Sequence, residues 1–269
     1  MSLLKGLPTS LVPVTTDKKM NLLTPLSCCI LVLIISFQEF FCQEEFYSKN
    51  SCDNEEIRTF IVNRHNELRS KVQPPPANML KMKWFDHVAL NAQNWAKTCP
   101  SGHSKQDFRR TSDWGCGENL FLSNRPIGWF KVMQGWWDEN LNFEYGKGAI
   151  AVGKVIGHYT QFVWHKSWQI GCAFHYCPGI EMCYIYVCHY CPAGNEKKFI
   201  SSPYTSGEKC ANCTDHCLNG LCTNYCPHED LYDECGELVD MCDEPEESME
   251  ESLRVNFICK ETCECKRKK

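Results

Sequence analysis

Cysteines are the residues of this chain with the clearest capacity for chemistry. The 269 residues include 21 cysteines. Two pairs, Cys188-x2-Cys191 and Cys210-x2-Cys213, have the spacing of zinc-ribbon ligands, and thiolates bind Zn²⁺ well. A sulfur in a disulfide is not a thiolate ligand. The redox environment therefore decides whether these residues predict a metal site or a set of bridges.

The N-terminal segment predicts an oxidising environment. Leu26–Phe37 (LSCCILVLIISF) is a short apolar run behind a basic flank, which is typical of a signal peptide. It is shorter than the ~20 apolar residues that a membrane span needs. We expect a secreted protein cleaved near Cys42, with Met20 as a hypothetical alternative start. The signal peptide would remove three cysteines, Cys28, Cys29 and Cys42.

The cysteines that remain are even in number. Removing 3 of 21 leaves 18. An even count in an oxidising compartment indicates nine disulfides and disfavours zinc bound by thiolates.

The elements that position these residues change in type along the chain. Apolar residues at helical spacing predict three helices, and short aromatic and β-branched runs predict three strands. Helices followed by strands indicate an α+β domain that ends near 190–195. Asp53 and Glu56 predict a capping box at the first helix. The predicted helices are 53–71, 85–98 and 127–140, and the predicted strands are 158–164, 168–176 and 182–190.

The C-terminal part has a different composition. Residues 210–265 contain ten cysteines in 56 residues, so bridges must replace an apolar core there. Residues 210–269 contain 15 acidic and 6 basic residues, a charge of −9, within a chain of net charge −5. Nothing in this balance indicates nucleic-acid binding. The acidic segment 243–251 is expected to be a solvated loop.

Several ordered motifs resemble the CAP superfamily, and specifically its cysteine-rich secretory proteins. Gly157–Trp164 (GHYTQFVW) and Val187–Asn195 (VCHYCPAGN) are similar to the two CAP signatures. His65–Arg69 and Cys116–Asn119 (CGEN) are similar to the first-helix and central motifs. The Cys-dense tail is similar to the hinge and ion-channel-regulator domain of the family.

The resemblance implies a domain order. It implies an N-terminal extension and signal peptide at 1–42, then a CAP domain at 50–195 with an α-β-α sandwich. A linker and disulfide hinge would follow at 196–225, and a small helical ShK-like module at 226–265. The His65 motif is expected to fasten the first helix to the sheet.

The resemblance also implies eight bridges, and the two cysteines left over, Cys52 and Cys183, are predicted to pair as a ninth. The implied bridges are Cys99–Cys177, Cys116–Cys191, Cys172–Cys188, Cys210–Cys217, Cys213–Cys222, Cys226–Cys265, Cys235–Cys259 and Cys242–Cys263.

The family's cleft maps onto two histidines and two glutamates: His103, Glu118, Glu139 and His158. Imidazoles with carboxylates suit Zn²⁺ or a similar ion, so His103 and His158 are predicted metal ligands with the glutamates completing the cleft. The alternative is that all four brace the cleft through hydrogen bonds. Acid/base catalysis is disfavoured, because no HExxH motif is present and no nucleophile stands out.

The predicted function is that of a non-enzymatic, monomeric protein that regulates an ion channel or cell-surface receptor through its cysteine-rich domain. Sperm function, or a glandular or venom secretion, is the expected setting. The module offers little of the lysine and aromatic surface that toxin-like relatives present to a cation pore. Asn212 in Asn212-Cys213-Thr214 is a glycosylation candidate.

Two other functions stay open. One is a secreted CAP-type hydrolase that uses the His/Glu cleft. The other is a lipid or sterol carrier, with four aromatic residues lining a groove, although aromatics at helical spacing more often belong to a core. Those residues are Trp129, Phe130, Trp136 and Trp137.

Overall fold

The computed structural model describes residues 45–226, 228, 230–243 and 255–266. The predicted signal peptide, nearly all of the acidic segment 243–251 and residues 267–269 lie outside the described residues. Among the described helices, none combines the length and apolar character that crossing a membrane requires.

A four-stranded sheet forms the centre of the domain, in the order β1-β5-β6-β2. β1 runs parallel to β5, and the other neighbours are antiparallel. The long β5–β6 hairpin therefore carries most of the sheet, and β2 lies at one edge. The strands are β1 (Lys83–Trp84), β2 (Gly117–Ser123), β5 (Gln169–Tyr176) and β6 (Tyr184–Cys191), with a separate ribbon of β3 (Phe143–Glu144) and β4 (Gly148–Ala149).

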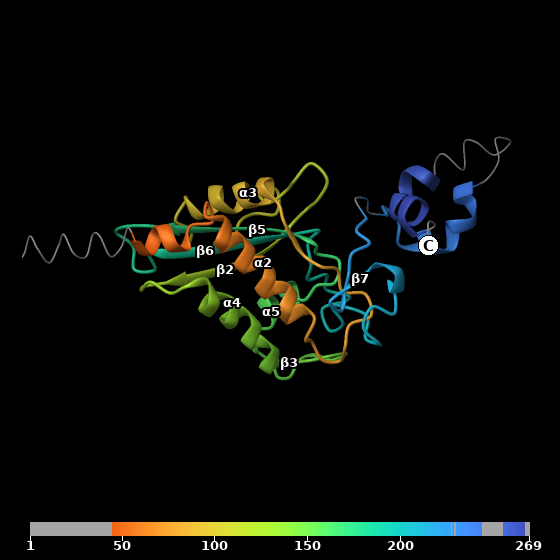
Figure 1. Ribbon diagram of the computed structural model, residues 1–269, viewed down its shortest axis with the longest axis horizontal. Helices are drawn as coiled ribbons and strands as arrows, with labels where there is room; N and C mark the ends of the chain where they lie inside the picture. Colours follow the sequence, from red (N-terminus) through yellow and green to blue (C-terminus); the bar gives the residue numbers. More distant parts are fainter. Residues whose placement is uncertain (1–44, 227, 229, 244–254, 267–269) are drawn as a thin grey trace, which may run out of the picture. The chain divides into compact units, whose positions relative to one another are not determined.

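Helices cover both faces of this sheet, which makes the α-β-α sandwich that the resemblance implies (Figure 1). α3 packs so tightly on β5 that a Cβ atom at Gly171 would lie 2.1 Å from the Ala89 nitrogen. The opposite face is covered by a larger core that contains Trp129 and Trp136. The helices are α2 (Glu55–Arg69), α3 (Asp86–Ala96), α4 (Trp129–Asp138), the 3₁₀ turn η1 (Glu139–Asn142) and α5 (Gly157–Phe162).

The three predicted helices are confirmed, with ends that differ by a few residues. The predicted cap is wrong: Asn54, not Asp53, accepts a hydrogen bond from the Glu56 backbone N–H and caps α2. The helix also ends at Arg69, two residues before the predicted end at residue 71.

Two of the three predicted strands are confirmed as β5 and β6. The prediction of a strand at 158–164 is wrong, because this aromatic and β-branched run forms the short helix α5. Tyr159, Thr160 and Phe162 are all buried in it, and tertiary packing overrides their strand propensity. β2, which carries the CGEN motif, was not predicted.

The structure contains the eight bridges that the resemblance implies. All four cysteines of the two zinc-ribbon-like pairs, Cys188, Cys191, Cys210 and Cys213, therefore form disulfides. The predicted ninth bridge is wrong, because Cys52 and Cys183 are both free thiols.

The two thiols have different surroundings. Cys52 packs against the main core and shares a pocket with Ala89 and Gln93 of α3. Cys183 lies just before β6, and its carbonyl accepts from the backbone N–H of Cys177, which is already bridged to Cys99. Burial also raises the pKa of the Cys52 thiol.

The chain after the sandwich is held by short elements and bridges. The hinge contains η2 (Thr214–His216) and a two-stranded ribbon of β7 (Cys217–Leu218) and β8 (Leu221–Cys222). The Lys81 N–H donates to Cys222, which ties the hinge to the segment before β1. Asn212 is exposed in this hinge, and its glycosylation stays a prediction. The last module contains the 3₁₀ segment η3 (Asp233–Asp243) and the π-helical turn η5 (Glu261–Lys266).

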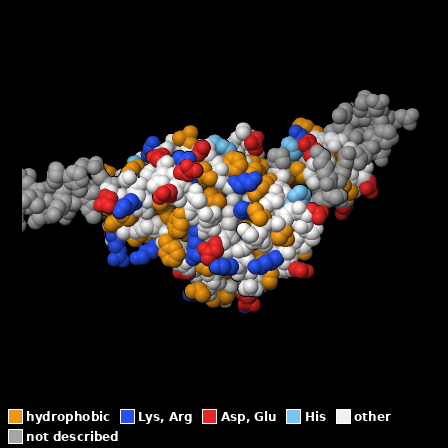
Figure 2. Space-filling model, viewed as in Figure 1, with side chains coloured by type: hydrophobic (Ala, Val, Ile, Leu, Met, Phe, Trp, Pro, Cys, Tyr) orange, Lys and Arg blue, Asp and Glu red, His pale blue; other side chains and the backbone are white. Residues whose placement is uncertain are grey.

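Charged side chains of both signs are interspersed on the face shown in Figure 2, with hydrophobic side chains in small groups between them. No single-sign patch dominates that face.

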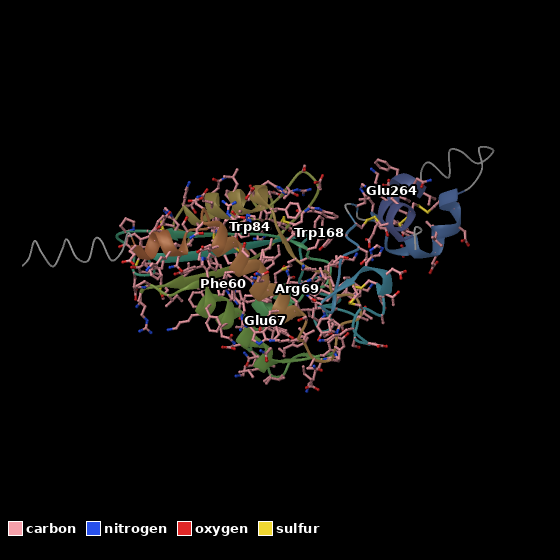
Figure 3. All side chains as sticks on the ribbon, in the orientation of Figure 1. Phe60, Glu67, Arg69, Trp84, Trp168 and Glu264 are labelled. Atoms are coloured by element: carbon pink, nitrogen blue, oxygen red, sulfur yellow. A yellow bond between two sulfur atoms is a disulfide. The ribbon has the colours of Figure 1, made fainter. Side chains whose placement is uncertain are left out.

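One buried charge, that of Arg69 on α2, links this helix to the segments that precede β1 and β5. The Arg69 side chain is 0% exposed and donates to the backbone carbonyls of Leu80, Phe162, Trp164, His165 and Ser167 at 2.8–3.3 Å (labelled in Figure 3). Burial lowers the pKa of Arg69 to about 9, so the guanidinium stays charged at neutral pH.

We expect Arg69→Lys to lower the free energy of unfolding by at least about 2 kcal/mol. A lysine ammonium has three donors, so at least two of the five carbonyls would lose their partner, at ~1–3 kcal/mol each. Urea unfolding of the purified protein measures the change. Arg125→Lys, at an exposed arginine, is the control and should stay within about 0.5 kcal/mol of the wild type. Equal stability of the two variants would contradict the role given to Arg69.

Candidate functional site

The site is built where β2 meets the loop that precedes it. Glu118 lies on β2, and its side chain is only 1% exposed. His103 comes from the loop after α3, and its Nδ1 lies 2.7 Å from Glu118 Oε1. The His103 ring is half exposed, so the outer edge of the imidazole faces the solvent while its inner nitrogen is held by the carboxylate.

Glu118 is saturated with hydrogen bonds. Its carboxylate accepts from the backbone N–H of Ser104 at 3.0 Å and from the Ser104 hydroxyl at 2.7 Å. His189 Nε2, on the neighbouring strand β6, lies 3.0 Å from Oε2. Burial opposes ionisation, but the hydrogen bonds from His103, His189 and Ser104 outweigh it, so the pKa of Glu118 lies well below its ordinary value. The carboxylate is therefore a fixed negative charge behind His103.

A second, similar pair forms at the start of α5. Glu139, at the start of η1, accepts from the backbone N–H groups of His158 and Tyr159 at 2.8 and 3.1 Å. Its other oxygen lies 2.6 Å from His158 Nδ1. A carboxylate at the exposed N–H groups of a helix start is favourable. The same contact orients the His158 ring, which lies beside Trp136.

The two histidines lie next to each other. Their ring centroids are 6.3 Å apart, and the His158 side chain is 27% exposed. Each Nδ1 is bonded to a carboxylate, which leaves both Nε2 atoms as electron-pair donors. A Zn–N bond is about 2.1 Å long, so one ion would bind both rings only with their Nε2 atoms within about 4.2 Å of each other.

The arrangement refines the predicted roles of the four residues. The structure brings His103, Glu118, Glu139 and His158 together as the resemblance implies. The glutamates do not complete an open ligand ring, because their oxygens are occupied by histidine and backbone donors. They hold and orient the two histidine rings, and such contacts make an imidazole a better donor to a metal. Two protein nitrogens with open positions form a weak site.

Sequence reasoning missed His189. His189 lies within the second CAP signature, where no role was assigned to it. Its position in the sequence, 71 residues after Glu118, gives no sign that the two side chains meet. Its signal lies in the register: Glu118 pairs with His189 across the β2–β6 ladder, so both side chains share one face. Burial lowers the pKa of His189. The neutral ring donates through Nε2–H, and its buried Nδ1 has no hydrogen-bond partner among the described residues.

The His65 motif fastens α2 to the sheet, as predicted. Burial lowers the pKa of His65 to about 3, so the ring is neutral. Its Nδ1 lies 2.8 Å from the Ile61 carbonyl, and its Nε2 lies 3.0 Å from the Tyr190 hydroxyl on β6. Asn119 donates to the same hydroxyl and to the backbone carbonyl of His158. This chain of contacts connects α2 to the His158 side of the site.

The aromatic residues considered for a lipid groove belong mainly to the core. Trp129 and Trp136 are 2% and 1% exposed. Trp137 packs edge-on against Tyr159 and Phe162. Phe130 is 53% exposed on α4. Their helical spacing therefore reflects packing, as the sequence pattern suggested.

Two other groups in the described chain bring potential ligand atoms within 4.8 Å of one another: Cys99, His175 and Cys177, and the hinge cysteines 210, 213 and 222. All of these sulfurs are in disulfides. They provide no thiolate and leave His103 and His158 as the better candidates for a metal.

Comparison with protein families accounts for most of the chain. Residues 62–190 match the CAP model, described as the cysteine-rich secretory protein family, and residues 210–269 match the Crisp model. Cysteine-rich secretory protein 2 of Homo sapiens is 45% identical over 214 residues, which cover 79% of this chain and 85% of that protein. The protein of the same name from Cavia porcellus has the same identity and coverage.

Solved structures have the same fold. Na-ASP-1 is 27% identical with a TM-score of 0.54, and the match covers 63% of this chain and 47% of that one. NaASP2, solved with Zn²⁺, is 30% identical with a TM-score of 0.52, and the match covers 63% of this chain and 96% of that one.

Glu118 predicts a defined pH dependence of stability. A carboxyl whose pKa is lower in the folded state stabilises the fold above the unfolded pKa of about 4.5, and this contribution is lost as the pH falls below that value. We expect the wild type to lose at least about 1.4 kcal/mol more than Glu118→Gln between pH 6 and pH 3, the equivalent of one pKa unit.

Urea unfolding at the two pH values measures this difference. Ser104→Ala, which removes one hydrogen-bond donor to the carboxylate, should lose part of the pH dependence and serves as the graded control. An identical pH dependence in the wild type and Glu118→Gln would show that the carboxylate is not stabilised in this way.

Proposed function

The chain belongs to the cysteine-rich secretory protein family, and on that premise we propose that it is a secreted, non-enzymatic protein that regulates a membrane ion channel or cell-surface receptor through its C-terminal module. An extracellular location fits the family and the eight disulfides. A reproductive, glandular or venom secretion is the setting that we propose.

The observation that carries this proposal is an exposed surface on the bridged module. Leu231, Tyr232 and Phe257 are 68%, 58% and 65% exposed. The Leu231 N–H donates to the Ile258 carbonyl, which brings the two segments together. Lys260 lies with its ammonium 5.8 Å from the Phe257 ring centroid. Neighbouring exposed apolar side chains can form an interaction surface, and aromatic residues are common binding anchors.

This surface changes an expectation from the sequence. The sequence suggested little of the lysine and aromatic surface that blocks cation pores, because segment 243–251 is strongly acidic. The structure places Phe257 and Lys260 together just after that segment. Three disulfides hold the module around a small core, so the surface is rigid when it meets a partner.

Current recordings with the full secreted chain test the channel proposal. We expect the wild type to change a current in a panel of calcium, potassium and cyclic-nucleotide-gated channels. Phe257→Ala should weaken the effect at least about tenfold, as expected for loss of a binding anchor. Leu141→Ala, at a 75% exposed leucine of the CAP domain, is the matched control and should act like the wild type. No effect across the panel, or equal potency of both variants, would contradict the proposal.

The His/Glu cleft enters the proposal as a weak Zn²⁺ site. Both Nε2 atoms are free to bind, and a CAP structure 30% identical to this chain was solved with Zn²⁺. A bound ion would supply a positive centre at the cleft. The residues of this chain would hold and orient it, His103 and His158 as ligands with Glu118 and Glu139 behind them.

Zinc titration by calorimetry tests this site. We expect one weak site in the wild type and at least a tenfold loss of affinity in His103→Ala and in His158→Ala, since each removes one of two protein ligands. His175→Ala, at a histidine beside a disulfide, is the control and should bind like the wild type. Unchanged affinity in the cleft variants would place any bound zinc elsewhere.

A further inference from the structure

An open groove of about 670 Å³ lies away from the His/Glu cleft. Its wall includes Trp114 and Trp168 from the CAP domain and Asn224 and Tyr225 from the hinge. Glu264 of the C-terminal module, labelled with Trp168 in Figure 3, also borders it. A groove of this size can hold a small organic ligand of several rings.

Three polar atoms in the wall of this groove are buried and have no hydrogen-bond partner among the described residues. They are Trp168 Nε1, Asn224 Oδ1 and the Tyr225 hydroxyl. Buried polar groups without partners are rare and cost about 1–3 kcal/mol each. These three atoms include donors and an acceptor. Small side-chain rotations would turn them toward the groove, where a ligand with hydroxyl groups would supply the missing hydrogen bonds.

The groove also presents aromatic faces. The Trp168 and Tyr225 rings have centroids 4.8 Å apart with an interplanar angle of 34°. The Lys83 ammonium lies 4.0 Å from the Tyr225 centroid and also contacts that ring. Phe85 meets Trp168 edge-on at 5.2 Å. These contacts hold Trp168 in a fixed orientation beside the three atoms without partners.

The charges at the groove are largely paired with each other. Lys166 Nζ lies 3.3 Å from Glu261, and His228 Nε2 lies 2.8 Å from Glu264. Neither a positive nor a negative centre is left over from these pairs to attract an ion. An anionic ligand would have to compete with Glu261 for Lys166, and a fully apolar ligand would leave the three polar atoms unsatisfied.

From these observations we infer that the groove binds a neutral saccharide. Sugars combine hydroxyl groups, which both donate and accept hydrogen bonds, with apolar ring faces that lie against aromatic side chains. The three polar atoms supply partners for the hydroxyl groups, and the ring of Trp168 supplies an apolar face. This site is separate from the Phe257 surface and from the His/Glu cleft, so it does not depend on the proposed function.

Saturation-transfer NMR with the full secreted chain tests the inference. The probes are lactose, maltotriose and triacetylchitotriose. We expect at least one to bind, and its affinity to fall about three- to tenfold in Trp168→Phe and in Tyr225→Phe, which each remove one hydrogen-bonding group and keep an aromatic ring. Trp84→Phe is the matched control, because its indole N–H donates to Asp86 outside the groove.

Asn212 also lines the groove, so a glycan on this residue could fill it. The same titrations on Thr214→Ala, which removes the sequon, separate this case from a free ligand site. Binding in Thr214→Ala that is weakened by Trp168→Phe supports the inference. The inference is overturned if no probe binds to the folded Thr214→Ala protein, or if Trp168→Phe and Tyr225→Phe bind as tightly as Trp84→Phe.

Discussion

The buried guanidinium of Arg69 sets the constraint on which the rest of the CAP domain depends. A charge without a carboxylate partner is tolerated in the interior only if its donors are satisfied, and here five backbone carbonyls satisfy them. Those carbonyls belong to the end of α5, to the segment that leads into β5 and to the chain before β1. One side chain on α2 thus fixes three segments that are distant in sequence, and α5 carries His158 into the site.

The C-terminal part is stabilised differently. The sandwich buries Trp, Tyr and Phe side chains in a continuous core, whereas the last module buries chiefly its own cysteines and Val255. A disulfide limits the freedom of the unfolded chain and therefore stabilises a segment that has little apolar surface to bury. Because the core of this module is small, Leu231, Tyr232 and Phe257 remain exposed. Their exposure is a consequence of having bridges in place of a core, and it provides a surface that a partner can use.

The sandwich, the eight bridges and the four cleft residues could be predicted because the family's ordered motifs can be read directly in the sequence. The sequence could not predict what depends on pairing across the sheet. Glu118 and His189 meet only through the β2–β6 register, and neither β2 nor its register is visible in local spacing. An even number of cysteines does not require that all of them pair, and Cys52 and Cys183 are both free. The 158–164 segment has the composition of a strand, yet the contacts of Tyr159 and Phe162 with α4 and the core make it a helix.

The geometry of the cleft orients two outer ring nitrogens. Each histidine is held at Nδ1 by a carboxylate that is itself fixed by backbone donors, which suits a metal ligand and a general base alike. Binding is therefore favoured over catalysis only by the sequence, which offers neither an HExxH motif nor an evident nucleophile. Such fixed pairs orient the lone pairs of the outer nitrogens and stabilise a positive charge placed between them. One buried and one partly buried carboxylate behind two partly exposed imidazoles suit the cation that we propose for this cleft. Because the protein would supply only two nitrogens to such an ion, water or a group from a partner would complete its ligands.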